Sequence, residues 1–305
     1  MSVFTPLTHD QLTEVLAAHG LRLAQATPIS EGIENSNYRI DAVDSAGRPL
    51  ALVLTLFEQL EAEQLPWFCE ALSQLAATGL PVPEPRAGRI VQCRGRPTVL
   101  VPRLPGTHLQ WPDDAALEQI GAALARIHLS PLPASPCPAP PPQAQLQLLF
   151  LHHADALSAD DQAQAASLMQ RWQALDSPPV LCHGDLFRDN VLFDHGQLSG
   201  LLDFYNAGPG CPLYDLAITQ NDWCRAADNQ LAAERDAILL AGYTAVRPLS
   251  AEQLALLPLA RTVAALRFWL SRLAQPHSAE GTLGQGHKDP QEFEQIYRQR
   301  LAALG

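Results

Sequence analysis

Two apolar segments joined by a tight turn, each next to a polar side chain, limit most strongly what this chain can fold into. Val180–Phe193 reads VLCHGDLFRDNVLF, which sets His183, Asp185 and Asn190 in an HxDxxxxN spacing closed by an apolar strand. An Asp-His-Gly turn follows, and a second apolar strand ends at Asp203. We therefore expect a β-hairpin across which Asn190 and Asp203 face each other.

These oxygen-bearing side chains suit phosphoryl transfer. That chemistry needs cations that bridge phosphates and a group that orients and deprotonates the attacking hydroxyl. A carboxylate with an amide carbonyl is a ligand set that Mg²⁺ accepts, so Asn190 and Asp203 are the predicted metal ligands. Asp185, five residues before Asn190, is the predicted catalytic base. Taken singly, a loop Asp or Asn can serve only to bond backbone amides, and it is the ordered set that favours catalysis.

The order of predicted elements indicates two lobes. A chain of 305 residues is too long for one minimal core. A small sheet-and-helix lobe is expected first, with a helix over 8–19, strands over 37–43, 50–57 and 99–101, and a helix over 65–77. Helical patterns dominate from 113–129 onward. We predict an N-terminal lobe at 1–102 and a C-terminal lobe at 103–305.

Composition excludes several classes of partner. The formal net charge is −12, so a nucleic acid backbone would be repelled. The N-terminus has no basic stretch leading into an apolar one, and nowhere do 18 apolar residues run together, so we expect a cytoplasmic protein without a membrane anchor. The sequence gives no indication of oligomeric state.

Two segments carry a resemblance to a known superfamily. HGDLFRDN looks like the catalytic loop of the protein-kinase-like aminoglycoside phosphotransferases and choline kinases, and LLDFYNAGP followed by YDLA looks like their metal-binding segment. The resemblance implies an α+β bilobal fold, with an N-terminal antiparallel sheet plus helix and a mainly helical C-terminal lobe. It also implies ATP in the cleft with Mg²⁺. His183 would support the catalytic loop, and Asp215 would buttress it, unless Asp215 is an N-cap or an ordinary buried acceptor.

Further segments resemble one branch of that superfamily, the homoserine kinases. They are EGIENSNY at 31–38, LVLTL at 52–56, GLPVP at 79–83, AALARIH at 122–128, LRFWLSR at 266–272 and HKDPQEF at 287–293. The likeness covers nearly the whole chain and implies phosphorylation of L-homoserine to O-phospho-L-homoserine in threonine biosynthesis. The alternatives are a kinase of the same class acting on choline, an aminoglycoside or a thiosugar, and a nucleotide-binding regulator without turnover.

The chain departs from the superfamily at the nucleotide. The only lysine among 20 basic residues is Lys288, and Thr55 falls where protein kinases carry the lysine that pairs with the α- and β-phosphates. Asn35, Ser36 and Arg103 are the predicted ATP contacts in its place, with Arg39 as an alternative to Arg103. A plain hairpin loop remains the alternative for the segment that contains Asn35 and Ser36.

An α-amino acid acceptor needs a cation for its carboxylate and an anion or carbonyl groups for its ammonium. Arg267, Arg272 and Asp222 are the candidates by position. Ordinary salt bridges are the alternative for all three. Glu70, which would partner the absent lysine, is expected to be a surface charge.

Overall fold

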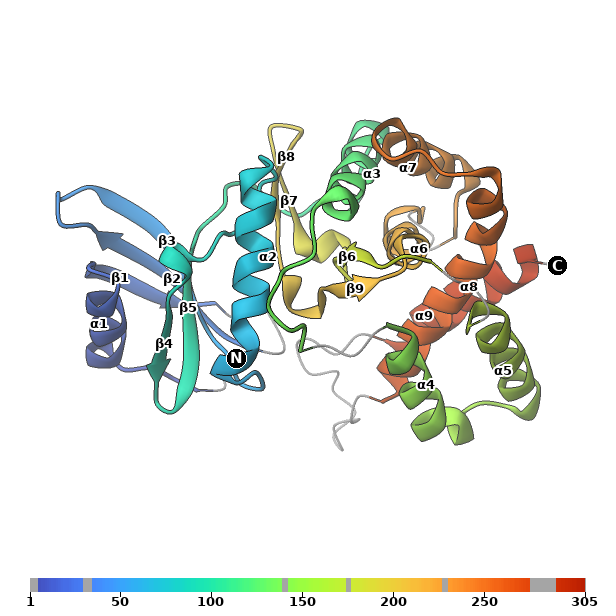
Figure 1. Cartoon of the computed structure of the whole chain (residues 1–305), viewed down its shortest axis with the longest axis horizontal. Coiled ribbons are helices and arrows are strands. Elements are labelled where there is room, and N and C mark those ends of the chain that lie inside the picture. Colours follow the sequence, from blue (N-terminus) through green and yellow to red (C-terminus); the bar gives the residue numbers. More distant parts are fainter. Residues whose placement is uncertain are drawn as a thin grey trace. The chain divides into compact units, whose positions relative to one another are not determined.

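The computed structural model (Figure 1) describes residues 5–29, 35–138, 142–173, 177–226, 230–274 and 289–304. These residues form two compact units. The first is made of the chain up to Pro105 together with Pro133–Pro138, and the second of Gly106–Leu132 and the described residues from 142 onward. The assignment of 1–102 and 103–305 to a nucleotide-covering and a catalytic lobe stays a prediction. Lys288 and the first half of the segment at 31–38 lie outside the described residues.

The first unit is built on a five-stranded antiparallel sheet with the strand order β1-β2-β3-β5-β4 (Figure 1). Its strands are β1 (Arg22–Pro28), β2 (Ser36–Val43), β3 (Pro49–Leu56), β4 (Ile90–Cys93) and β5 (Arg96–Pro102). The predicted hairpin of β2 and β3 is confirmed. The sequence did not predict β1, because this edge strand buries only one side chain, Leu23, and therefore lacks an apolar alternation.

Helix α1 (His9–Ala18) covers one face of this sheet. Thr8 caps it as predicted: its Oγ1 accepts from the Gln11 amide, and the Gln11 side chain accepts in return from the Thr8 amide. Gly20 then adopts a left-handed φ of +69° that ends the helix. The apolar face of α1 and the inward side chains of the strands form one core, which includes Leu12, Val15, Leu16, Tyr38, Ile40, Leu52, Leu54 and Leu100.

Glu70, on helix α2 (Leu65–Ala77), is a half-buried charge that contacts another segment of the first unit. Its carboxylate accepts from the amides of Ala134 and Ser135 at 2.8 and 3.1 Å and from the Ser135 hydroxyl at 2.9 Å. These backbone hydrogen bonds hold the pKa of Glu70 below its usual value. The carboxylate thereby fixes part of a proline-rich segment that has few donors of its own.

The second unit is mainly helical and carries two small two-stranded sheets. Its helices are α3 (Asp114–Leu129), α4 (Pro142–His153), α5 (Ala159–Gln173), α6 (Pro212–Trp223), α7 (Ala233–Val246), α8 (Ala251–Leu273) and α9 (Pro290–Leu304). The sheets pair β6 (Val180–Cys182) with β9 (Gly208–Gly210) and β7 (Val191–Asp194) with β8 (Gln197–Leu201). The α+β class, with an antiparallel sheet first and helices after it, is confirmed.

Helices α3 and α7 lie side by side and cross at two glycines (Figure 1). A Cβ on Gly121 would come within 2.1 Å of the Leu239 carbonyl oxygen, and one on Gly242 within 2.2 Å of the Glu118 oxygen. Backbone faces backbone at this crossing, so no side chain can yield to make room. The glycines therefore set the distance between the two helices.

Gly121→Ala should consequently destabilise the protein. In an open helix this change would stabilise by about 1 kcal/mol through helix propensity. Here the added methyl group must push α7 away, and we expect a loss of about 1–3 kcal/mol in the free energy of unfolding. Urea denaturation followed by circular dichroism measures it, and a stabilised variant would show that the helices can separate without cost.

Helix α8 is the one described helix that is long and apolar enough to cross a membrane. Most of its apolar stretch is buried inside the second unit, where it contacts α6 and α9. A buried core helix of a globular protein has the same length and composition, so this helix is weak evidence for a membrane span.

Candidate active site

The loop between β6 and β7 holds Asp185 and Asn190 together. The loop turns tightly, because the Phe187 amide donates to the Asp185 carbonyl at 2.8 Å and the Asn190 amide to the Phe187 carbonyl at 2.9 Å. The Asn190 Nδ2 donates to the Asp185 carbonyl at 2.8 Å and to its carboxylate Oδ2 at 3.3 Å. Since Nδ2 is used toward Asp185, Oδ1 is the atom of Asn190 that suits a cation.

The β7–β8 hairpin brings Asp203 next to Asn190. The pairing differs from the expectation by one residue, because Asn190 lies opposite Leu202, whose amide donates to the Asn190 carbonyl at 2.8 Å. Ser199 is the additional residue of a β-bulge between the pairs Leu192–Gly200 and Phe193–Leu198. Without this bulge the ladder would set Leu201 opposite Asn190 and move Asp203 one residue farther away.

Asp203 has an unusual backbone conformation. Its φ and ψ are +59° and +60°, in the left-handed region that side chains other than glycine rarely adopt. Such a residue costs on the order of 1–3 kcal/mol, and the surrounding structure must compensate it. The backbone turns at Asp203, between the end of β8 and the short 3₁₀ helix η5 (Phe204–Asn206).

His183 is fully buried and neutral. Its Nε2–H donates to the Leu202 carbonyl at 2.9 Å, while Nδ1 accepts from the Asp185 amide at 3.3 Å, which fixes one tautomer. Burial is the largest influence and lowers its pKa. The ring also packs on Phe204, with the ring centroids 4.4 Å apart. His183 therefore links the loop that carries Asp185 to the segment that carries Asp203.

Asp215, in the first turn of α6, is the acceptor that fixes the start of the loop that carries Asp185 and Asn190. It accepts from the amides of His183 and Gly184 at 2.7 and 2.8 Å and from His128 Nε2 at 3.0 Å. Burial alone would raise its pKa, but the hydrogen bond from His128, the electrostatic interaction with that ring and the Gly184 amide hold that pKa below its usual value. Asp215 is not the N-cap of α6, since Cys211 occupies that place.

His128 extends this network to α7. Its Nδ1 lies 2.7 Å from the Tyr243 hydroxyl, which also accepts from Arg247 at 3.1 Å. His128, Cys182 and Asp215 lie close enough together to hold a metal ion, but both Asp215 oxygens already accept hydrogen bonds. The sequence did not mark His128 as part of the site, although it ends the segment AALARIH.

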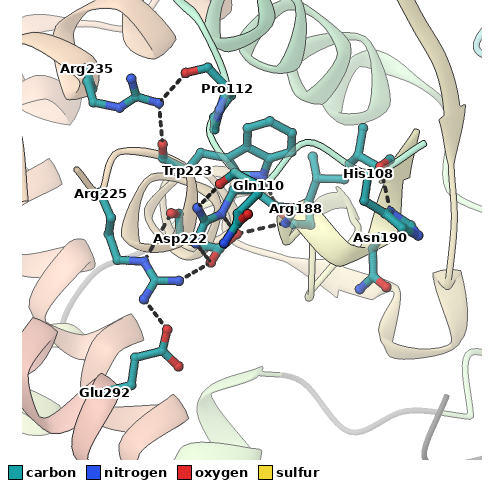
Figure 2. Close-up of polar contacts among 12 residues, drawn as sticks. His108, Gln110, Pro112, Arg188, Asn190, Asp222, Trp223, Arg225, Arg235 and Glu292 are labelled. Carbon is teal, nitrogen blue, oxygen red and sulfur yellow. Dashed lines mark hydrogen bonds and ion pairs between the residues drawn. The ribbon is translucent and has the colours of Figure 1, made fainter. Parts of the chain in front are cut away.

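Asp222, predicted to bind a substrate ammonium, is paired with two arginines (Figure 2). Each of its oxygens accepts two hydrogen bonds: Oδ2 from the Arg188 amide and Nε, and Oδ1 from the Nη2 of Arg188 and of Arg225. Arg225 continues to Glu292, which also binds Arg272, the predicted carboxylate ligand. The direct substrate roles of Asp222 and Arg272 stay predictions.

Arg267, the other predicted substrate ligand, contacts the loop that carries Asp185. Its Nη1 donates to the Gly184 carbonyl at 3.3 Å and its Nη2 to the Gln145 side chain at 3.1 Å. The Nε is buried without a hydrogen-bond partner among the described residues. Arg267 thus brings a positive charge beside the residue that precedes Asp185.

The predicted ATP contacts belong to the first unit. Ser36 is fully buried and donates to Glu58 Oε1 at 2.6 Å, and Asn35 Oδ1 accepts from the Glu58 amide at 3.3 Å. Arg103 pairs with Asp41 of β2 at 3.2 Å. Thr55 lies on β3 as expected and donates to Asn37 Oδ1 at 2.8 Å. Contacts of Asn35, Ser36 and Arg103 with a nucleotide stay predictions.

Comparison with known proteins agrees with this geometry. The model of the phosphotransferase enzyme family matches residues 25–249, which are most of the chain and include the loop, the hairpin and α6. The chain belongs to this family. It is 40% identical to a homoserine kinase of Pseudomonas aeruginosa over 98% of this chain and 96% of that protein. It is 37% identical to a homoserine kinase of Neisseria meningitidis over the full length of both.

Solved structures show the same fold at lower identity. An amicoumacin kinase in complex with AMP-PNP and Ca²⁺ superposes with a TM-score of 0.67, covering 97% of this chain and 93% of its own at 17% identity. A macrolide 2′-phosphotransferase from Brachybacterium faecium gives a TM-score of 0.64, covering 97% of both chains at 17% identity. At these identities the likeness establishes the protein-kinase-like phosphotransferase fold of this chain.

Proposed function

We propose that this protein is an ATP-dependent kinase that phosphorylates the hydroxyl of L-homoserine to O-phospho-L-homoserine, a step of threonine biosynthesis. The observation that carries the proposal is the identity of 37–40% with homoserine kinases of several bacteria over nearly the whole length of both chains. The linked loop and hairpin supply the groups that such a transfer needs.

Asp185 would act as the base. It is an acceptor on a loop whose backbone is fixed by Asp215 at one end and by the β7–β8 hairpin at the other, so its position is set before substrate arrives. The base accepts the hydroxyl proton as the oxygen attacks the γ-phosphate. His183 would contribute by holding the Asp185 amide and not by exchanging protons, because it is buried and neutral.

The donor set fits Mg²⁺. Asn190 Oδ1 and the Asp203 carboxylate are hard oxygen ligands, and Asp203 directly follows the residue whose amide bonds the Asn190 carbonyl. Two protein ligands leave further positions for phosphate oxygens and water, which is how Mg²⁺ usually binds nucleotides. When bound there, Mg²⁺ would neutralise charge on the triphosphate. This matters because the described residues of the first unit include arginines but no lysine that could pair with the phosphates.

The remaining assignments complete the proposal. Residues 1–102 would contact ATP through Asn35, Ser36 and Arg103, and residues 103–305 would carry the catalytic and acceptor-binding groups. Arg267 would place positive charge near the reacting groups, since it already touches the Gly184 carbonyl. The protein would act in the cytoplasm, where ATP and free amino acids are available.

A panel of acceptors tests the proposal. L-Homoserine, L-serine, L-threonine, choline and kanamycin are offered with ATP and Mg²⁺, and ADP release is followed with the phosphorylated product identified by ³¹P NMR. We expect turnover with L-homoserine, and kcat/KM about 10–200-fold lower with L-serine, which lacks one methylene group. Turnover with choline or kanamycin but not with L-homoserine would overturn the substrate assignment while leaving the kinase activity.

A further inference from the structure

A cavity of about 440 Å³ lies beside the catalytic loop in the second unit (Figure 2). It is lined by residues of the loop, of α6, α8 and α9, and of the segment before α3. Its charged lining residues are Arg188, Asp189, Asp222, Arg225, Arg272 and Glu292. Three positive and three negative side chains therefore line the cavity, and their formal charges sum to zero.

Arg188 and Glu292, the two ends of the row of linked ion pairs, are partly open to solvent, and the neighbouring Asp189 is exposed. The side chains of Asp222, Arg225 and Arg272 are only 4–7% exposed, and their charges are satisfied by one another or by Arg188 and Glu292. Arg188 is 16% exposed and Glu292 27% exposed. The cavity thus exposes part of the Arg188 guanidinium, which Asp222 and the Gln110 carbonyl hold in place, and part of the Glu292 carboxylate, which Arg225 and Arg272 hold in place.

We propose that this cavity binds the acceptor as a zwitterion, with its α-carboxylate on Arg188 and its α-ammonium on Glu292. The inference rests on the proposed function and names the residues that give it specificity. Asp222, Arg225 and Arg272 are then positioning residues: they orient the two ligands and touch no substrate. A balanced pair of opposite charges complements a zwitterion, whose own net charge is zero.

The same lining disfavours the other acceptors of this fold. An aminoglycoside is a polycation and needs an excess of acidic groups, which this balanced lining lacks. Choline is held through its quaternary ammonium on the open faces of aromatic rings. The exposed Trp111 lines the cavity, but the Arg188 guanidinium already lies over its ring, 5.6 Å from the centroid.

The position of Arg188 suits this role. Its Nη1 donates to the Gln110 carbonyl at 2.7 Å, while Nε and Nη2 are bound to Asp222, so the guanidinium has one fixed orientation. Arg188 follows Asp185 by three residues, and three residues of chain span at most about 10 Å. The proposal requires that the hydroxyalkyl chain of an acceptor held on Arg188 extends from the cavity to Asp185.

Truncated acceptors combined with single substitutions test the assignment. 3-Amino-1-propanol is L-homoserine without the carboxylate, and 4-hydroxybutanoate is L-homoserine without the ammonium group. For Arg188→Gln we expect kcat/KM with L-homoserine to fall about 100-fold, and kcat/KM with 3-amino-1-propanol to change less than about threefold. For Glu292→Gln we expect kcat/KM with L-homoserine to fall, and kcat/KM with 4-hydroxybutanoate, which has no ammonium group, to change less than about threefold.

Glu294→Gln is the matched control, because Glu294 lies on the same helix, is 39% exposed and pairs with Arg298 outside the cavity. Circular dichroism and calorimetric binding of L-homoserine separate misfolding from lost recognition. Arg188→Lys, which keeps the charge without the planar fork, replaces Arg188→Gln if that variant does not fold.

Equal losses with all three acceptors would overturn the inference while the proposed function stands. A wild-type protein that phosphorylates choline or kanamycin and no amino acid would overturn both.

Discussion

Asp185→Asn should lower kcat by about 10²–10⁴-fold, the range that a positioned general base contributes. The substitution is nearly isosteric, and an asparagine oxygen can still accept the hydrogen bond that Asn190 Nδ2 donates to Asp185 Oδ2. The loop should therefore keep its shape while losing the group that takes the hydroxyl proton. A stopped assay with L-homoserine and saturating ATP measures the change.

Two controls make the result specific. Asp194→Asn alters a carboxylate that is 49% exposed at the tip of the same hairpin, and it should leave kcat within about twofold. Calorimetric titration of Asp185→Asn with ATP and Mg²⁺ should give an affinity like that of the unaltered protein. A variant that retains more than a tenth of the activity would show that Asp185 is not the base. A regulator without turnover would instead show no rate to lose.

Removing the Asp215 carboxylate should produce the largest loss of stability. Asp215→Ala leaves the His183 and Gly184 amides and His128 without their acceptor in a buried site. Breaking a buried, hydrogen-bonded charge pair by deleting one partner costs about 3–5 kcal/mol. Urea unfolding at neutral pH measures this loss, and activity should fall with it because the catalytic loop loses its anchor. Asp155→Ala, at an exposed position, should change stability by less than about 0.5 kcal/mol.

Acid should act on the same group. The pKa of Asp215 is lower in the folded protein than its ordinary value of 3.8, so its stabilising contribution is complete above that value and is lost as the pH falls through the folded pKa. Between about pH 5 and pH 2 the unfolding free energy of Asp215→Ala should therefore decline less steeply than that of the unaltered protein. If the unfolding free energy of the two proteins declined equally with falling pH, the ionised carboxylate of Asp215 would not contribute to stability.

The sequence predicted the β7–β8 hairpin because the residues that form it are close together in the chain. Asp185 and Asn190 are five residues apart, and the turn before β8 is short, so local geometry alone brings Asn190 to Asp185 and opposite the residue before Asp203. The capped helix α1 and the β2–β3 hairpin were predictable for the same reason, since caps and turns are local signals.

What could not be predicted depends on contacts distant in sequence. Glu70 accepts hydrogen bonds from amides about 64 residues away, and Arg188 pairs with Asp222. Both contacts depend on tertiary packing, which no local sequence pattern indicates. The strand β9 reads Gly-Pro-Gly and has no apolar alternation, because its pairing with β6 uses only the backbone. The one-residue difference opposite Asn190 arose from a bulge, which sequence period alone does not reveal.

That bulge also limits how the hairpin can change its length over evolution. Between Asn190 and Asp203, the returning strand contains one more residue, Ser199, than a regular ladder would hold. A regular ladder that kept Ser199 would set Leu201 opposite Asn190, carry Asp203 about 3.3 Å farther along and turn it to the opposite face of the strand, whereas deleting Ser199 would leave Asn190 opposite Leu202. Between Leu198 and Asp203, relatives should therefore either keep the additional residue as a bulge or lose one residue and the bulge together.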